Sequence, residues 1–155
     1  MDSDEIDWIV GEISADYGSP LMALVHKCYD RDVDALTSQE WHAKCNDFGA
    51  TLTFIELVNG RKIALFLPDS MKNSGWRRDW RSASLFTVNG AGTNKQCKPT
   101  HKNTLYFYDH SGYGPTMGSS NDIHVGQNML DVSSNPGTYD VTASELIGGS
   151  TAYVK

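Results

Sequence analysis

The dipeptide Asn59-Gly60 is the feature that most constrains the fold, because it stands between two strand-like runs. Residues 51–58 are rich in β-branched side chains that partly alternate with polar ones, and residues 61–67 form an apolar run that ends at Pro68. Asn-Gly is the strongest short signal for a β-hairpin, since both residues tolerate the positive φ of a tight turn. The unbroken apolar run predicts a return strand that is buried on both faces.

The rest of the chain continues the strand pattern. Further strand-like runs follow at residues 84–88, 103–109, 123–125 and 150–155. Polar, turn-rich stretches separate these runs, and we expect surface loops at residues 69–79 and 128–139.

Two helices are expected before the first strand. Ile6, Ile9, Val10 and Ile13 have the spacing of one helix face, and Gly18 follows as a terminator. A second helix is expected over residues 38–45, where Thr37 and Glu40 have the spacing of a capping box. Helices followed by hairpin-connected strands predict an α+β fold, mainly an antiparallel β-sandwich of two sheets flanked by short helices.

Residues 111–125, with the sequence SGYGPTMGSSNDIHV, form a glycine- and proline-rich bend before a short strand. Gly112 and Gly114 permit positive φ, and Pro115 fixes its own φ and lacks a donor N–H. So many backbone constraints predict a loop whose shape is fixed by the sequence and which offers a partner a defined surface.

Charge is distributed unevenly along the 155 residues, which carry 13 basic and 19 acidic side chains and a net charge of −6. Six of the acidic residues lie in the first 16 positions, where there is no Lys or Arg, so the remainder is balanced at 13 against 19 − 6 = 13. This balance argues against a nucleic-acid binder. The acidic leader is either a solvated helix face or a docking element for a basic partner.

The chain shows neither a secretory signal nor an apolar run of the roughly 18 residues that a membrane span needs. We therefore expect a soluble cytoplasmic protein. Its three cysteines, at irregular spacing, predict reduced thiols. Cys97 is the redox candidate, because Lys95 and Lys98 flank it in a segment that is expected to be exposed. The alternative is an incidental surface cysteine.

Two further groups of residues have side chains that could form a chemical centre. His42 and Cys45 lie at i and i+3 on the expected helix, and His26 and Cys28 of the preceding segment could join them, but two ligands do not make a zinc site. Cys45 as a small buried side chain and His42 as a hydrogen-bonded packing residue explain the pattern better, so neither a metal nor a cofactor is expected.

Asp122 and His124 lie at i and i+2, and a shared strand face would allow an acid/base pair. The alternative is that the Asp122 side chain caps a turn and fixes the loop.

An aromatic and basic run suggests an interaction surface. Its members are Trp76, Arg77, Arg78, Trp80 and Arg81. Trp and Arg are favoured at the centres of protein interfaces, so a protein partner is a better explanation than single-stranded nucleic acid.

Several pieces of the chain, in a fixed order, resemble those of the TLDc family, whose best-known members are the oxidation-resistance proteins. They are residues 41–45 (WHAKC), 49–55 (GATLTFI), Trp80 with 84–88 (SLFTV), 113–118 (YGPTMG) with Asp122-Ile123, and 145–149 (ELIGG) with Tyr153-Val154. The resemblance implies a β-sandwich with short helices, a role in oxidative-stress protection and, as in several members, contact with the V-type proton pump. It implies no enzymatic activity common to the family, and it implies one more acidic strand after Lys155.

Together these observations predict an acidic helical segment at residues 1–20 and a TLDc-like domain at residues 21–155. The expected function is a non-catalytic protein-interaction module in the oxidative-stress response, with the V-type proton pump as partner. The alternative is a thiol-based scavenger or weak enzyme that uses Cys97 or the pair of Asp122 and His124. The expected interaction surface consists of Trp76, Arg77, Arg78, Trp80, Arg81, Tyr113, Gly114, Pro115, Gly118 and Asp122.

Overall fold

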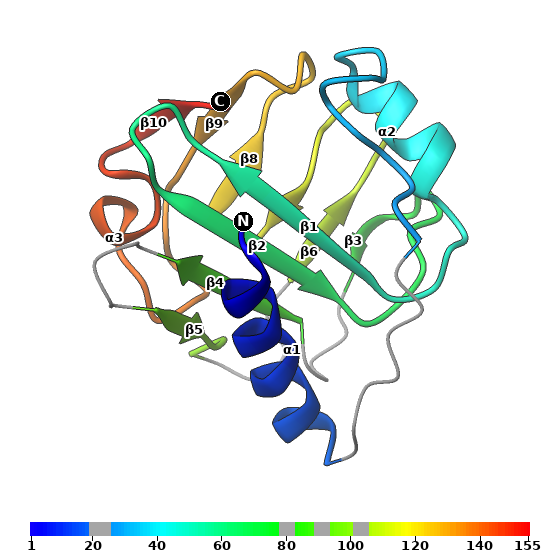
Figure 1. Ribbon diagram of the computed structural model, residues 1–155. Coiled ribbons are helices and arrows are strands. Elements are labelled where there is room, and N and C mark those ends of the chain that lie inside the picture. Colours follow the sequence, from blue (N-terminus) through cyan, green and yellow to red (C-terminus); the bar gives the residue numbers. More distant parts are fainter. Residues whose placement is uncertain (19–25, 78–82, 89–93, 101–105) are drawn as a thin grey trace.

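The computed structural model describes residues 1–18, 26–77, 83–88, 94–100 and 106–155, and it shows two antiparallel β-sheets packed face to face (Figure 1). The four-stranded sheet has the order β1 (Thr51–Glu56), β2 (Lys62–Leu67), β4 (Ser84–Val88) and β5 (Lys95–Cys97). The six-stranded sheet has the order β10 (Thr151–Tyr153), β9 (Asp131–Ser133), β8 (Ile123–Val125), β7 (Thr116–Met117), β6 (Phe107–Asp109) and β3 (Gly75–Arg77). The predicted α+β sandwich is confirmed.

The hairpin at Asn59-Gly60 joins β1 to β2 as predicted. Gly60 has a φ of +83° and donates its N–H to the carbonyl of Leu57 at 2.9 Å. The register pairs Thr51 with Leu67 at one end of the hairpin. The turn residues therefore fix the alignment of the two longest strands, as hairpin geometry requires.

Strand β2 is buried on both faces, which its apolar run predicted. Ile63 and Leu65 belong to the core between the sheets, whereas Ala64 and Phe66 belong to a second apolar cluster on the opposite side. Because successive side chains of a strand point to opposite faces, one strand serves two cores. The second cluster requires a further layer to cover it.

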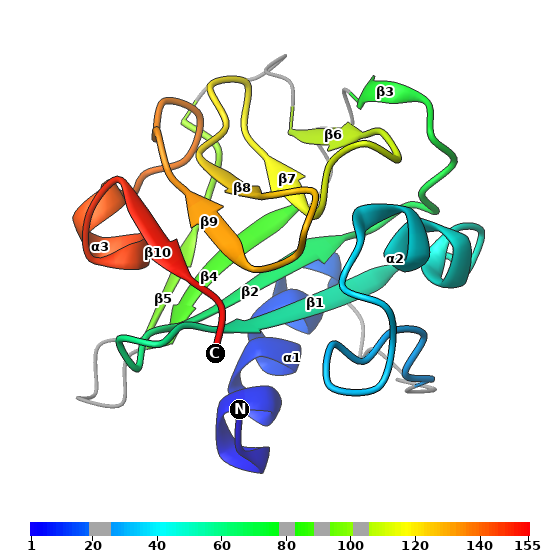
Figure 2. The same cartoon turned by 90° about the horizontal axis from the view of Figure 1, so that it is seen from above.

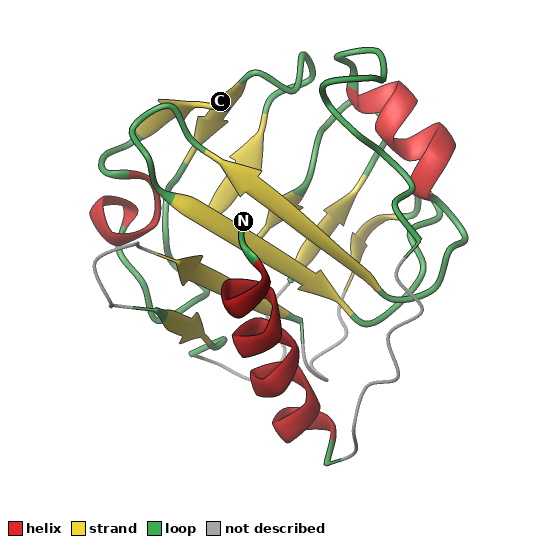
Figure 3. Ribbon diagram, in the orientation of Figure 1, coloured by secondary structure: helices red, strands yellow, loops and turns green. Residues whose placement is uncertain are grey.

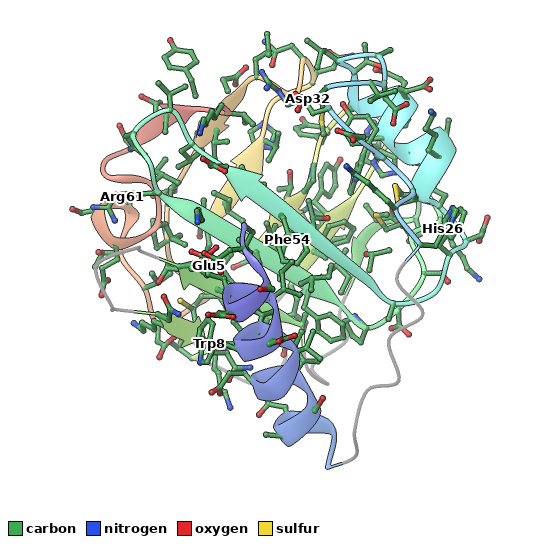
Figure 4. All side chains as sticks on the ribbon, viewed as in Figure 1. Glu5, Trp8, His26, Asp32, Phe54 and Arg61 are labelled. Atoms are coloured by element: carbon green, nitrogen blue, oxygen red, sulfur yellow. A yellow bond between two sulfur atoms is a disulfide. The ribbon has the colours of Figure 1, made fainter. Side chains whose placement is uncertain are left out.

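That layer is helix α1 (Ser3–Tyr17), which packs against the outer face of the four-stranded sheet (Figures 1 and 2). Ile9 and Ile13 are 0% and 2% exposed and lie in the same cluster as Phe66 and Phe86. Figure 4 shows Glu5 and Trp8 on this helix, over the same sheet face as Phe54 of β1. The predicted helix face is thus confirmed as the buried one.

Local signals end α1 where the sequence suggested. Asp2 and Glu5 form a reciprocal capping box at its start, and Gly18 adopts a left-handed conformation at its end. Two shorter helices, α2 (Ser38–Cys45) and α3 (Ala143–Ile147), lie at the margins of the sandwich (Figure 3). None of the described helices has the length and apolar character that a bilayer crossing requires.

The expected surface loops at residues 69–79 and 128–139 are wrong in part. They contain β3 and β9, and Val132 of β9 is 1% exposed. Both strands are only three residues long, so they show too little alternation for a pattern to reveal. The expected strand at residues 103–109 begins outside the described residues and continues as β6.

Candidate interaction surface

Five rings form a continuous series of contacts, which we call the aromatic row: Trp76, Tyr108, His110, Tyr113 and His124. The centroid of Tyr108 lies 4.7 Å from Trp76, 5.7 Å from His110 and 4.9 Å from Tyr113. The centroid of Tyr113 lies 5.2 Å from that of His124, with the two planes at 64°. These spacings are those of favourable edge-to-face and offset aromatic pairs.

The strand register places Trp76, Tyr108 and His124 on one face of the six-stranded sheet, and the loop rings His110 and Tyr113 contact them there. Trp76 pairs directly with Tyr108 across β3 and β6. Phe107 is buried and Tyr108 half-buried, and in β8 Ile123 is buried while His124 is half-buried. Since side chains alternate between faces, Tyr108 and His124 both point away from the core.

The aromatic row is accessible. Trp76 and Tyr113 are each 38% exposed. Whereas α1 covers the outer face of the four-stranded sheet, no described helix lies over the outer face of the six-stranded one (Figure 2). Partly exposed Trp and Tyr that touch one another are typical of a binding surface.

A buried carboxylate, that of Asp109, fixes one end of the row. Asp109 is 0% exposed, and its Oδ2 accepts hydrogen bonds from the N–H groups of Lys72 and Ser74 at 2.7 and 3.2 Å and from the Ser74 hydroxyl at 3.0 Å. The imidazole Nδ1 of the buried His42 lies 3.8 Å from its other oxygen. These bonds hold the residues that lead into β3, and therefore the position of Trp76.

A second buried carboxylate, that of Asp122, fixes the other end. Asp122 Oδ2 accepts three backbone N–H bonds, from Gly137 at 3.0 Å and from Thr138 and Tyr139 at 2.8 Å each. Charge-assisted hydrogen bonds of this kind are stronger than neutral ones. The expected role of a local turn cap is replaced by a longer-range one, because the carboxylate joins the end of the 111–121 loop to residues 137–139.

The glycines of the bend are required by close packing. Gly118 has a φ of +85°, and a Cβ atom there would lie 2.0 Å from Asp122 Oδ1. A Cβ on Gly114 would lie 2.9 Å from the Met129 sulfur and from the Val125 carbonyl oxygen. Gly114, Pro115, Gly118 and Asp122 are all buried, so they shape the surface from beneath.

The acid/base pair of Asp122 and His124 is wrong, because the two side chains have separate partners. His124 Nδ1 is 2.9 Å from the Thr116 hydroxyl, which is its hydrogen-bond partner, while Asp122 is bound by backbone N–H groups. Burial lowers the pKa of His124, and the charge of Asp131 opposes this shift. His124 therefore contributes its ring to the aromatic row and not an acid/base pair with Asp122.

The prediction of reduced thiols is wrong for two of the three cysteines. Cys28 and Cys45 form a disulfide across 17 positions of sequence. The odd number and irregular spacing carried no signal for this pair, because the bond depends on how the segment before α2 folds back along the helix. The two sulfur atoms that could have served as metal ligands are bonded to each other.

The expected exposure of Cys97 is also wrong. Its side chain is 0% exposed, since β5 pairs it with Leu85 of β4 and turns it into the core. Burial raises the pKa of the Cys97 thiol to about 12. A thiol that is buried and protonated is a poor nucleophile, so the structure argues against Cys97 as a scavenger.

Of the remaining residues predicted for the interaction surface, only Arg77 lies within the part of the chain that the structure describes. Arg77 ends β3, and Arg78, Trp80 and Arg81 lie outside the described residues. Sequence reasoning missed Tyr108 and His110. Their signal was the short alternation of residues 107–109, in which Phe107 and Asp109 are buried and Tyr108 points to the same face as Trp76.

The chain matches the family model of the TLDc domain over residues 5–151, which is nearly its whole length. Among curated proteins, no match to the chain was found.

Proposed function

The chain belongs to the TLDc domain family, and on that premise we propose that it is a non-catalytic protein-interaction module that binds its partner through the aromatic row. Family membership supports an association with oxidative stress in general. The observation that carries the proposal is the row itself: five touching rings from three parts of the chain, two of them 38% exposed.

The architecture around the row favours recognition over chemistry. The carboxylates of Asp109 and Asp122 accept hydrogen bonds from backbone N–H groups and so hold loops in place. A surface whose shape is fixed before binding loses less conformational entropy when a partner docks. Trp and Tyr supply a large contact area with few rotatable bonds.

The partner that we propose is a subunit of the V-type proton pump. The support for this is the family resemblance, in which several members contact that pump. Trp76 and Tyr113 would form the centre of the interface, and the arginines of residues 77–81 would form its rim. The same proposal divides the chain into an acidic segment at residues 1–20 and a domain at residues 21–155. It also places the protein in the cytoplasm.

The test is binding of the purified protein to the purified peripheral domain of a V-type pump. We expect Trp76→Ala and Tyr113→Ala each to weaken binding at least tenfold, because aromatic anchors dominate interface energies. The matched control is Phe54→Ala, since Phe54 is 40% exposed but lies on the four-stranded sheet (Figure 4).

Two outcomes would contradict this proposal in different ways. Binding that is unchanged in both row variants would remove the aromatic row as the interface. No binding by the wild-type protein would remove the pump as the partner, and a pull-down from cell extract with the same three variants would then ask whether the row binds another protein.

A further inference from the structure

The segment of residues 26–37, which we call the connecting segment, leads from the α1 side of the molecule to the start of α2. In the structure it contains turns and bends but no helix or strand. It also includes an exposed apolar side chain, Val33, which is 78% exposed. The connecting segment thus contributes little to either apolar core and is held mainly by individual contacts.

Few contacts attach the connecting segment to the rest of the molecule. The covalent one is the disulfide between Cys28 and Cys45. Among the described residues, its polar contacts with the rest of the molecule include the ion pair of Asp34 with Lys44 and the hydrogen bond from Arg31 to the backbone carbonyl of Lys155. Thr37, at the end of the segment, caps α2 by accepting the N–H of Glu40. Single polar contacts of this kind are weak beside a covalent bond, so the disulfide is the strongest tie.

The two sulfur atoms differ in their surroundings. Cys45 is 1% exposed and belongs to the core between the sheets, whereas Cys28 is only partly buried and packs against that core from outside. His26 lies beside α2, where its ring stacks on Phe48 at 5.3 Å (Figure 4). An attacking thiolate can therefore approach the disulfide from the Cys28 side.

Helix α2 has contacts of its own that do not depend on the disulfide. Trp41 is 3% exposed in the core, and the Ser38 hydroxyl donates to the carbonyl of Ser111 at 2.7 Å. The N–H of Asp47, just after the helix, donates to the carbonyl of Met71 at 3.1 Å. Opening the disulfide would leave α2 in place and free only the connecting segment.

We propose that the Cys28–Cys45 disulfide is a reversible redox latch, which holds the connecting segment against α2 when oxidised and releases it when reduced. A dithiol reductant opens the latch. One of its thiolates attacks the Cys28 sulfur, and Cys45 leaves as a thiolate that takes up a proton. The second thiol of the reductant then displaces Cys28, so two electrons and two protons pass to the protein and the reductant becomes a disulfide.

Hydrogen peroxide closes the latch again. The Cys28 thiolate attacks one peroxide oxygen to give a sulfenic acid and hydroxide, which becomes water. The Cys45 thiol then displaces a second water and re-forms the disulfide. The overall change is two thiols and one peroxide to one disulfide and two waters. Cys97, buried on β5, does not compete for either partner.

The test is hydrogen–deuterium exchange of the whole chain, followed by mass spectrometry, before and after a dithiol such as dithiothreitol. We expect exchange in residues 26–37 to rise at least tenfold on reduction, while β1, β2 and β4 keep their protection. Hydrogen peroxide should restore the original pattern. Alkylation without denaturant should label Cys28 in the reduced protein and no cysteine in the oxidised one, because Cys45 and Cys97 stay buried.

Matched variants distinguish local release of the connecting segment from a general loss of structure. Cys28→Ser should show the released pattern without any reductant, and Cys97→Ser should exchange like the oxidised wild type. If Cys28→Ser does not fold, the comparison of oxidised with reduced wild-type protein still tests the proposal. The proposal is overturned if the disulfide opens only in denaturant, if reduction exposes the strands of both sheets, or if it leaves residues 26–37 unchanged.

Discussion

The two outer faces of the sandwich are used in opposite ways. The four-stranded sheet presents small and aliphatic side chains with Phe66 and Phe86, and α1 covers them with Ile9 and Ile13. The six-stranded sheet presents the aromatic row, in which Trp76 and Tyr113 are each 38% exposed. Among the described residues, α1 covers the first of these faces and no helix covers the second.

This difference indicates that the covered face mainly stabilises the fold and that the open face mainly serves binding. Burying aliphatic side chains under α1 stabilises the fold, since each fully buried Ile or Leu contributes about 1.5–3 kcal/mol. The aromatic row gains less from burial, and it depends on two carboxylates beneath it for its shape. We therefore expect changes under α1 to lower stability, changes in the row to lower binding, and changes in the carboxylates to lower both.

The largest effect is expected from Asp122→Ala, which tests whether the open face depends on its buried anchor. The change leaves three backbone N–H groups near Gly137–Tyr139 without an acceptor, so the free energy of unfolding should fall by about 4 kcal/mol. Urea unfolding measures this. Asp122→Asn keeps one acceptor oxygen and should lose less; equal stability of the alanine variant and the wild type would show that the carboxylate is not an anchor.

The covered face is tested by Ile9→Ala. Ile9 is 0% exposed under α1, and the cavity should lower the free energy of unfolding by about 3 kcal/mol while partner binding stays unchanged. The control on the same helix is Asp7→Ala, an exposed position where the change should stay within about 0.5 kcal/mol. A loss of binding in Ile9→Ala at a temperature where the protein is folded would break the proposed separation of the two faces.

The smallest effect concerns the pH dependence of the open face through His124. Burial lowers the pKa of His124 in the folded protein below its ordinary value of 6.5, so the unfolded chain binds more protons in the window just below that value. Stability from this group is therefore complete above about pH 6.5 and falls as the pH drops towards the folded-state pKa. His124→Gln should flatten the dependence of the melting temperature between pH 7 and pH 5, roughly the window in which histidine titrates. An unaltered slope would show that burial of this ring is unimportant.

The sequence predicted those elements whose signals are local. The Asn59-Gly60 turn, the apolar run of β2 and the left-handed end of α1 at Gly18 were all recognisable. In each case the deciding interaction lies within a few residues: a backbone conformation that glycine favours, or a strand with no polar face. The bend at residues 111–125 belongs to the same class, and the close approach at Gly118 confirms that its shape is constrained.

The site was predicted only in part, because its residues meet through pairings across distant segments. The residue types of Trp76 and Tyr113 by themselves favour an interface. Tyr108, which joins them, is recognisable only from the pairing of β3 with β6. The disulfide and the burial of Cys97 were missed for the same reason. A three-residue strand has too few positions to show a period, and a cysteine's partner depends on where two segments come together.

The sequence by itself determined that this chain forms hairpins, that one strand is apolar on both sides and that an amphipathic helix is available to cover it. These are properties of neighbouring residues, fixed by backbone preference and by the spacing of apolar side chains. Only the tertiary structure decided which carboxylates became anchors, which rings touched and which cysteines joined. Those outcomes depend on register between strands far apart in the chain, and a shift of one residue would turn each of these side chains to the opposite face.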